Sequence, residues 1–382
     1  MPVSGLPDVR PTRAVIDLGA LCENVALVQR AVGGAGVCAV VKADAYGHGA
    51  VPVARALEAS GACAALAVSL VEEGVALRDA GLALPILVMG PAQAGGHAEL
   101  VARELTPVVS DPGALDDLAA VGRRRGRAVP IHLKVDTGMG RLGIPWAELG
   151  PLVSRVLASG ALDLDGICTH FASADLPDLA AAASVTGDQL DCFDRALVAA
   201  RAAGAAPRLL HAANSAAAFR FPAARFDMVR PGIAIYGNGP VAPPVQVGSL
   251  RQVMQLESEV AQIRDIATGQ AVSYGGLWRA ERPSRIAVVP VGYADGFPRR
   301  LTGSADALVG GHRCPVVGAI SMDMTLVDIT GLAHDARVGD AVVLLGAQGD
   351  QSISAAELAE RAGLTEYEIT CGISRRVPRT YR

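Results

Sequence analysis

The segment from residue 37 to residue 89, VCAVVKADAYGHGAVPVARALEASGACAALAVSLVEEGVALRDAGLALPILVM, alternates short apolar runs with stretches of helical period. The apolar runs contain almost no polar residue, as expected of strands buried on both faces of a parallel sheet. The stretches between them repeat apolar residues every three to four positions, which is typical of helices. We predict strands at Val37–Lys42, Ala65–Val68 and Ile86–Met89, and helices at Val51–Ser60 and Leu70–Ala80.

The same alternation continues on both sides of this segment. Further strands are predicted at Ala14–Asp17, Thr106–Val109, Ile131–Val135, Gly166–His170, Leu209–Ala212 and Met228–Arg230, and helices at Leu18–Val32, Ala114–Arg124, Leu149–Ala158 and Ser184–Ala203. About eight strand–helix repeats favour a (β/α)8 barrel over an open sheet. The predicted strands exceed what a barrel needs, so a run at one end is either an extra strand or no strand.

The pattern changes after the Gly- and Pro-rich residues 237–244. Short, strand-like runs separated by Gly, Asp and Pro follow at Leu256–Ile263, Arg285–Val291, Cys314–Val317, Thr325–Ile329 and Ala341–Leu345. One helix is predicted at Ser354–Ala362, because Ser354 and Glu357 have the spacing of a capping box. We predict an α/β barrel domain at 14–244 and a mainly β domain at 245–382, on which residues 1–13 pack as an extension.

Composition excludes several classes of function. A net charge of −4 over 382 residues gives no reason to expect a nucleic-acid or membrane partner. No apolar run is long enough to span a bilayer, and the first residues lack the hydrophobic stretch of a secretory signal. The seven cysteines are odd in number and never spaced as CxxC, which favours reduced thiols over disulfides or zinc. We expect a cytoplasmic protein without a bound metal.

Charged or imidazole side chains stand at the C-terminal ends of several predicted strands. They are Lys42, Lys134, Asp136, His170, His211 and Arg230. In a (β/α)8 barrel these ends form the catalytic face. A single lysine there would usually be solvated, but the whole set predicts an active site. Lys42 leaves a buried strand, and desolvation lowers the pKa of an amine and frees it to form a Schiff base.

Residues 138–143 form a GxGxxG pattern, GMGRLG, after a predicted strand. A dinucleotide-binding loop of this type opens a helix directly. Here Ile144, Pro145 and Trp146 intervene, and we therefore reject a nicotinamide or flavin dinucleotide site.

An ordered set of motifs resembles the alanine racemase family over nearly the whole chain. The motifs are VVKADAYGHG at 40–49, KVDTGMGRLG at 134–143, THFASAD at 169–175, HAANS at 211–215, VRPGIAIYG at 229–237, VSYG at 272–275, VGYADG at 291–296, SMD at 321–323 and RVPR at 376–379. The resemblance implies a homodimeric racemase that uses pyridoxal 5′-phosphate (PLP) to interconvert L-alanine and D-alanine by a two-base mechanism. Supply of D-alanine for peptidoglycan is the implied role, and alanine catabolism is the alternative.

The resemblance also implies a role for particular residues. Lys42 would carry PLP and act as base on one face of the substrate, and Tyr274 of the partner subunit would act on the other. Arg230 would face the pyridine nitrogen, supported by His211 and linked to Tyr274 through His170. Because arginine only donates, the nitrogen would stay uncharged.

The remaining implied contacts concern the phosphate and the substrate. The phosphate would meet Tyr46, Asn214, Ser215, Gly232 and Ile233, and the substrate carboxylate would meet Arg141 and Met322. Lys134 would hold Arg141 as a carbamate, with an ordinary ion pair as the alternative, and Tyr293 and Asp323 would line the partner-side entrance. Two positions differ within the family: Arg375 stands where many members have a tyrosine near the phosphate, and Ser321 stands where some members have a cysteine.

Three other functions remain as alternatives. A racemase of the same fold acting on serine or on a broad set of amino acids differs only in the room left around Tyr274 and Tyr293. A fold-related PLP decarboxylase generally has an acidic residue at the pyridine nitrogen, which Arg230 contradicts. A non-catalytic PLP carrier has no need for the second domain with Tyr274.

Overall fold

The computed structural model describes residues 9–93, 95–239, 241, 243, 246, 248–332 and 335–382. Its contacts group the chain into two compact units. The barrel unit consists of residues 21–45 and 50–250, and the C-terminal unit of residues 9–20, 46–49 and 251–382, within the described ranges. The predicted domain boundary between residues 244 and 245 lies outside the described residues.

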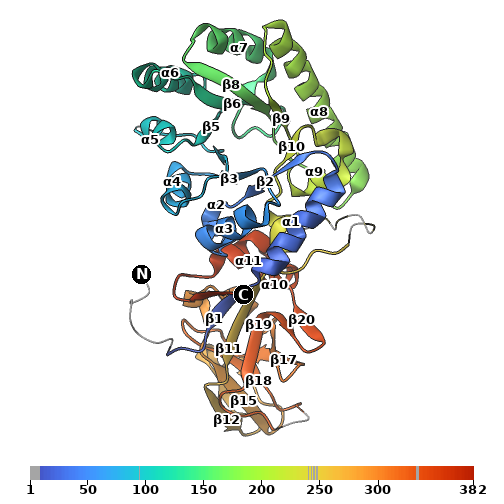
Figure 1. Ribbon diagram of the computed structural model, residues 1–382. Helices are drawn as coiled ribbons and strands as arrows, with labels where there is room; N and C mark the ends of the chain where they lie inside the picture. The colour runs from blue at the N-terminus through green and yellow to red at the C-terminus, as the bar shows by residue number, and fades with distance from the viewer. Residues whose placement is uncertain are drawn as a thin grey trace. The chain divides into compact units, whose positions relative to one another are not determined.

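The barrel unit is built on eight parallel strands that close on themselves, which confirms the predicted barrel class (Figure 1). In order around the barrel they are β2 (Gly36–Val40), β3 (Ala65–Val68), β4 (Ile86–Val88), β5 (Thr106–Val109), β6 (Val129–Asp136), β8 (Leu162–Cys168), β9 (Leu209–His211) and β10 (Met228–Val229). Met228 pairs with Gly36 to close the ring. The short strand β7 (Ile144–Pro145) pairs with β6 outside this ring.

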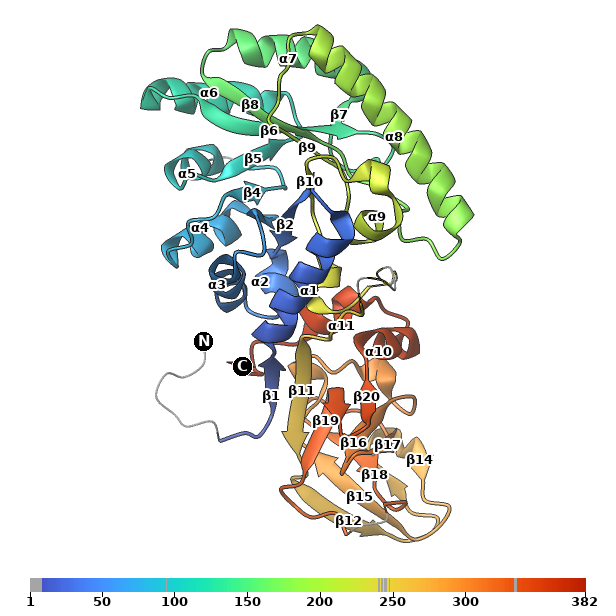
Figure 2. The same ribbon diagram turned by 45° about the vertical axis from the view of Figure 1, so that its right-hand side comes forward.

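Helices surround these strands on the outside, and Figure 2 shows the long helix α8 along one side of the barrel. They are α1 (Leu18–Val32), α3 (Ala50–Ser60), α4 (Val71–Asp79), α5 (Gly96–Ala102), α6 (Gly113–Arg125), α7 (Leu149–Ala158), α8 (Leu179–Ala202) and α9 (Ser215–Arg220). Alternate residues of β6, Ile131, Leu133 and Val135, join the apolar core shared with α6, α7 and α8. The residues between them, His132 and Lys134, therefore face the barrel interior.

The run at Ala14–Asp17 forms a strand, but its expected place among the barrel strands is wrong. Strand β1 (Arg13–Ile16) pairs with β11 (Met254–Glu259) and β21 (Arg379–Tyr381) in the C-terminal unit. Ala14 and Ile16 are fully buried there. An apolar run predicts that a strand is buried but not which sheet buries it, and the barrel closes without this one.

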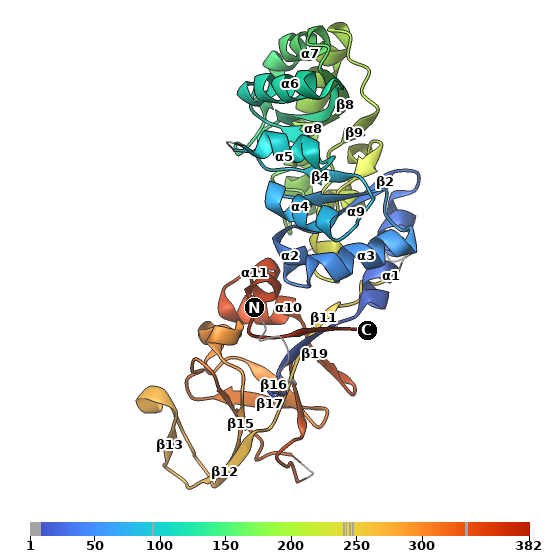
Figure 3. The ribbon, with the colours of Figure 1, turned by 60° about the vertical axis from the view of Figure 1, so that its left-hand side comes forward.

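The C-terminal unit is mainly β, as predicted. Its large sheet has the order β12 (Gln262–Ile266), β15 (Ser284–Val289), β18 (Thr325–Asp328), β17 (His312–Val317), β16 (Asp306–Val309), β19 (Ala341–Gln348), β11, β1 and β21, and β20 (Gln351–Ile353) pairs with β19. A separate hairpin of β13 (Ala271–Val272) and β14 (Trp278–Arg279) lies at the margin, where Figure 3 shows β13. Two helices, α10 (Ala355–Ala362) and α11 (Glu366–Gly372), complete the unit.

Two details of this unit differ from the predictions. The single strand expected at Leu256–Ile263 is two strands, because the chain changes partner at Val260: β11 pairs with β19, whereas β12 pairs with β15. Ser354 caps α10 by accepting from the backbone N–H of Glu357, at 3.0 Å. The Glu357 carboxylate does not complete the capping box, because it pairs with Arg313 at 2.6 Å.

Short 3₁₀ helices occur at η1 (Trp146–Glu148), η2 (Pro222–Ala224), η3 (Ile233–Tyr236), η5 (Tyr274–Gly276), η6 (Tyr293–Asp295) and η7 (Arg299–Leu301). Among the residues whose structure is described, no helix has the length and apolar character needed to cross a bilayer. All seven cysteines are free thiols.

Candidate active site

Lys42 stands at the C-terminal end of β2 and is followed by an unusual backbone turn. The residue is half-buried, and α2 (Lys42–Tyr46) begins with it. Ala43, Asp44 and Ala45 have φ of 52°, 54° and 54°, which makes this turn left-handed. Residues with a Cβ disfavour this conformation by about 1–2 kcal/mol each. Such strain clusters at functional sites, where the surrounding structure imposes it.

Two carboxylates support the left-handed turn within the barrel unit. The backbone N–H of Ala43 donates to Glu73 Oε1 at 2.6 Å, and that of Ala50 donates to Asp44 Oδ1 at 2.7 Å. These bonds tie the turn to α4 and α3. The strand-to-turn segment thus holds Lys42 at a fixed place on the face where the barrel strands end.

Arg230 is a buried polar group on this face with several hydrogen-bond partners. It follows β10, is 5% exposed and donates from Nη1 to His211 Nδ1 at 2.6 Å. Its Nη2 donates to the carbonyls of Thr169 at 2.7 Å and Ala212 at 3.0 Å, and contacts His170 Nδ1 at 3.3 Å. Within the described ranges, every side-chain hydrogen bond of Arg230 starts from one of these two terminal nitrogens, and its backbone N–H donates to the carbonyl of Ala213 at 2.8 Å. The structure therefore brings His170, His211 and Arg230 together.

Both histidines beside Arg230 are held neutral. Burial lowers the pKa of His170 and of His211 well below 6.5, and the positive charge of Arg230 lowers both further. Lys134, Arg141 and Lys42 add to this effect at His170. A neutral imidazole can accept a hydrogen bond from arginine, whereas an imidazolium cannot.

The lowered pKa values of His170 and His211 predict that the folded protein loses stability at acidic pH. Below about pH 6.5 the unfolded chain protonates both imidazoles while the folded chain does not, so the free energy of unfolding falls as pH falls. Each histidine contributes up to about 1.4 kcal/mol per pH unit. The free energy of unfolding, measured with urea at several pH values, should fall less steeply with decreasing pH in His170→Asn than in wild type. The slope of His312→Asn, which removes an exposed histidine, should match wild type; equal slopes in all three proteins would contradict the prediction.

Ser215 and Gly232 come together at the ends of β9 and β10. Ser215 Oγ accepts from the backbone N–H of Gly232 at 3.0 Å and of Ala234 at 3.3 Å. Ile233 follows directly and opens η3. The neighbouring Asn214 caps α9, since its Oδ1 accepts from the N–H of Ala217 at 3.0 Å. The structure thus gives the Asn214 side chain a local role in ordering this loop.

Asp136 organises the loop that carries Arg141. Its Oδ1 accepts from the backbone N–H groups of Gly138, Met139 and Gly140 at 3.0, 2.9 and 3.1 Å. Burial opposes ionisation of Asp136, but these bonds outweigh it and lower the pKa. The glycine-rich segment therefore wraps around a carboxylate of its own chain, and Arg141 follows as an exposed side chain.

Lys134 lies in the barrel interior and is 8% exposed. Burial lowers the pKa of its amine, the Cys168 thiol opposes that shift, and the charges of Arg230 and Arg141 lower the pKa again. The neutral amine is therefore favoured more than in an exposed lysine.

Some residues that order this face gave no signal in the sequence. Gln189 of α8 accepts from the backbone N–H of Ala172 at 2.9 Å and donates to Thr137 Oγ1 at 3.2 Å. Thr137 and Thr169 hydrogen-bond to each other at 2.8 Å. This cluster fixes the loops after β6 and β8, and a lone glutamine in an alanine-rich helix does not reveal it.

Tyr46 belongs to the C-terminal unit by its contacts. It is 6% exposed, and its ring centroid lies 5.8 Å from that of Tyr367. Burial raises the pKa of Tyr46, so the phenol stays protonated and keeps a hydroxyl donor. The next residue must be glycine, because a Cβ on Gly47 would lie 2.2 Å from the carbonyl oxygen of Thr370.

Tyr274 lies at the tip of the β13–β14 hairpin and is 72% exposed. The preceding Ser273 has φ 62° and ψ −176°, a region that is nearly restricted to glycine. Its Oγ donates to the carbonyl of Ala319 at 2.7 Å. This side-chain bond helps to anchor a strained residue directly before Tyr274.

The two contributions of Ser273 can be separated by substitution. Ser273→Ala should lower the free energy of unfolding by about 1 kcal/mol, because the hydrogen bond is lost while the strained φ remains. Ser273→Gly loses the same bond, but glycine adopts positive φ without strain and should lose less. Urea unfolding measures both variants. A glycine variant less stable than the alanine variant would refute the strain argument.

Tyr293 and Met322 are joined through their backbones. The N–H of Tyr293 donates to the carbonyl of Ser321 at 3.0 Å, and that of Ala294 donates to the carbonyl of Met322 at 3.0 Å. Tyr293 is 42% exposed and Met322 52% exposed. The C-terminal unit thus presents the loops of Tyr293 and Met322 as one surface.

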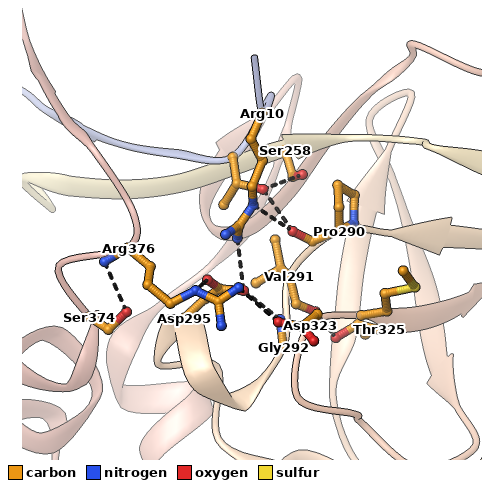
Figure 4. A network of polar contacts seen from close by, with 12 residues as sticks. Arg10, Ser258, Pro290, Val291, Gly292, Asp295, Asp323, Thr325, Ser374 and Arg376 are labelled. Carbon is orange, nitrogen blue, oxygen red and sulfur yellow. Dashed lines mark hydrogen bonds and ion pairs between the residues drawn. The ribbon is translucent and has the colours of Figure 1, made fainter. Parts of the chain in front are cut away.

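The buried carboxylate of Asp295 makes several contacts with the residues around this surface (Figure 4). Asp295 is fully buried; its Oδ2 accepts from the N–H of Gly292 at 3.0 Å and lies 2.8 Å from Arg10 Nη2. Arg376 Nε is 3.5 Å from Asp295 Oδ1, and Arg376 Nη2 donates to Asp323 Oδ1 at 2.8 Å. Asp323 therefore acts in an ion-pair network, and the neighbouring Arg375 is exposed.

Comparison with known proteins places this chain in a family. A family model described as "Alanine racemase, N-terminal domain" matches residues 16–240, and one described as "Alanine racemase, C-terminal domain" matches residues 253–381. The chain belongs to the alanine racemase family. Among curated members of the alanine racemase family, the proteins from Sorangium cellulosum and Symbiobacterium thermophilum are 46% and 44% identical to it. Each alignment covers 98% of this chain, with 100% and 98% of the relatives.

Solved alanine racemases have the same fold as this family member. The enzyme from Streptomyces lavendulae has a TM-score of 0.90 and 36% identity, covering 99% of this chain and 98% of that one. The alanine racemase from Bartonella henselae, solved with covalently bound pyridoxal phosphate, has a TM-score of 0.87 and 29% identity, covering 97% and 99%. The Bacillus anthracis enzyme, solved with bound L-Ala-P, has a TM-score of 0.87 and 35% identity, covering 99% and 96%.

Proposed function

We propose that this protein is a PLP-dependent alanine racemase that interconverts L-alanine and D-alanine. Beyond family membership, the observation that carries the proposal is the buried Arg230, fixed at the end of β10 by four contacts from its terminal nitrogens. An arginine facing the pyridine nitrogen of PLP would donate a hydrogen bond to it without giving up a proton, so the nitrogen would stay uncharged.

The residues of the barrel unit fit PLP. The described side-chain hydrogen bonds of Arg230 all come from its terminal nitrogens, so Nε would be the donor to an accepting ring nitrogen. Lys42 supplies the amine for covalent attachment, and Ser215 with the backbone at Gly232 and Ile233 supplies donors for a phosphate. Tyr46, four residues after Lys42 but grouped with the C-terminal unit by its contacts, keeps its hydroxyl proton and is proposed as a further donor to the phosphate. Bound PLP supplies an electron sink that makes the α-proton of an amino acid removable.

The chain's own residues then move and place the proton. The Lys42 amine removes or returns it on one face of the substrate, and Tyr274 of the partner subunit does so on the opposite face. Arg230 would keep its own proton and donate a hydrogen bond to the ring nitrogen, so that this nitrogen would stay unprotonated. The neutral His170 next to Arg230 provides the link toward the tyrosine.

Arg141 and the backbone of Met322 are proposed to bind the substrate carboxylate. The lowered pKa of Lys134 supports carbamylation of its amine, because only a neutral amine attacks carbon dioxide. The resulting negative charge would pair with Arg141. Tyr293 and Asp323 are assigned to the rim of the site.

The proposed molecule is a cytoplasmic homodimer with two shared sites. The barrel unit is proposed to contribute Lys42, Ser215 and Arg230 to PLP binding, and residues 251–382 to complete the partner's site. The 72% exposure of Tyr274 on the isolated chain supports this arrangement, since a catalytic phenol is expected to be enclosed when the site is complete. Supply of D-alanine to peptidoglycan is the proposed role.

The test is conversion of L-alanine to D-alanine by the purified, PLP-loaded protein, with L-serine as a parallel substrate. Turnover of alanine well above serine supports the proposal. Comparable turnover of serine would make the protein a broader racemase with the same chemistry. No turnover of either, despite covalent PLP on Lys42, would reject the enzyme assignment in favour of a PLP carrier.

A further inference from the structure

A column of polar side chains runs through the barrel interior, where branched apolar residues are the rule. His132 Nδ1 lies 2.7 Å from His211 Nε2, and the two side chains are 1% and 0% exposed. His132 Nε2 lies 3.2 Å from Asp165 Oδ2. Since His211 Nδ1 also contacts Arg230, the column links Asp165 to Arg230 through two histidines.

The strands are shaped to admit His132. Strand β8 contains a bulge opposite it: Ile131 pairs with Leu164 and His132 with Gly166, so Asp165 is the extra residue. A Cβ on Gly166 would lie 2.6 Å from His132 Nδ1, so only glycine lets the imidazole approach. Bulges of this kind redirect side chains next to functional sites.

The chemistry of the two ends allows one arrangement of protons. Arg230 only donates, so His211 Nδ1 must accept and its single proton must sit on Nε2. That proton is then donated to His132 Nδ1, which leaves the proton of His132 on Nε2. Asp165 must accept this last bond. If His132 were protonated, its Nδ1 would donate to His211 Nε2. The proton of His211 would then have to sit on Nδ1, where it would face the N–H donor of Arg230.

Asp165 is suited to be the accepting end. Arg208 Nε and Nη2 donate to its two oxygens at 2.8 and 2.9 Å. The bond from His132 and then those from Arg208 outweigh burial and lower the pKa of Asp165 to about 2. The carboxylate is therefore ionised at any pH at which the enzyme would work.

We propose that Asp165 and His132 are positioning residues for Arg230: Asp165 fixes the tautomers of His132 and His211, and these hold Arg230 in place as a donor. The part of this inference that concerns the cofactor rests on the proposed function, since Arg230 is taken to face the PLP ring nitrogen. The hydrogen-bond order itself does not depend on that assignment.

The first test reads the tautomers directly. The PLP-loaded protein, labelled with ¹⁵N-histidine, should show His132 and His211 with protonated Nε2 and unprotonated Nδ1. The chain has seven histidines, and His132→Gln and His211→Gln assign the two signals. A proton on Nδ1 of either residue in the wild-type protein would overturn the proposal.

The second test uses matched variants of β8. Asp165→Leu removes the acceptor and should lower kcat by roughly 10- to 100-fold with little change in KM, as for partners that orient metal-bound histidines. It should also change the tautomer signals. Asp165→Asn keeps an accepting oxygen and should restore both towards wild type. Asp163→Leu, an exposed site two residues earlier, is the control and should change neither.

The outcomes separate the two proposals. If Asp165→Leu and Asp163→Leu have equal kcat, the positioning role is rejected even if wild type is a racemase. If wild type lacks racemase activity but has the expected tautomers, the proposed function fails and the hydrogen-bond order stands. If Asp165→Leu does not fold, the wild-type tautomers decide, because a proton on Nδ1 of either histidine overturns the proposal.

Discussion

Lys42→Ala is expected to lower kcat/KM for alanine by about 10⁴-fold, the upper end for loss of a positioned acid–base group. The expected effect is large because the same amine is proposed to have two tasks, covalent attachment of PLP and proton transfer on one face of the substrate. Borohydride reduction of wild-type protein should fix PLP to Lys42, and peptide mapping should find none in the variant. Racemisation and attachment are thus measured on the same samples.

The composition of the chain makes this experiment unusually clean. Lys42 and Lys134 are the only lysines in the sequence. Lys134→Ala is therefore the matched control for attachment, and it should still carry PLP at Lys42. Attachment of PLP to Lys134 in wild-type protein, or retained racemisation in Lys42→Ala, would show that the proposed lysine is wrong.

Tyr274→Phe should lower the rate of racemisation by about 10³-fold, within the range for removal of one acid–base group. Because the phenol is proposed to serve one face only, one enantiomer of alanine should still exchange its α-hydrogen with D₂O, without inversion. NMR of alanine recovered from D₂O measures this. The side chain is 72% exposed, so loss of its hydroxyl should change stability by no more than about 0.5 kcal/mol.

Mixing this variant with Lys42→Ala tests whether the site is shared. A heterodimer would have one site with both defects and one with neither, and about half of wild-type activity should return. Verified heterodimers with no recovered activity would place Tyr274 in the site of its own subunit.

The sequence predicted the architecture well where the local pattern and the global fold coincide. Runs such as Ala65–Val68 and Thr106–Val109 match β3 and β5 residue for residue, and Leu18–Val32 matches α1. Polar residues after such runs, Arg230 and His211 among them, meet on the face where barrel strands end. Parallel strands bring those ends together, so order along the chain was enough.

Other features depend on partners distant in sequence and could not be predicted. The assignment of β1 to the wrong sheet is one case, since pairing with β11 and β21 leaves no mark in its own residues. The column from Asp165 is another. His132 is two residues from Lys134 and so shares its face, but nothing local indicates a bulge in β8 or an acceptor at Asp165.

The pairing of β1 also determines when this strand can fold during synthesis of the chain. The eight barrel strands lie within residues 36–229, so the ring can close while the ribosome is still translating the second half. Strand β1 emerges first, yet its partners begin at Met254 and at Arg379. Its edge stays unpaired for most of translation, and its parallel partner appears only when residues 379–381 are made. The exposed edge of β1 is therefore a segment that chaperones would need to shield from unwanted pairing during synthesis.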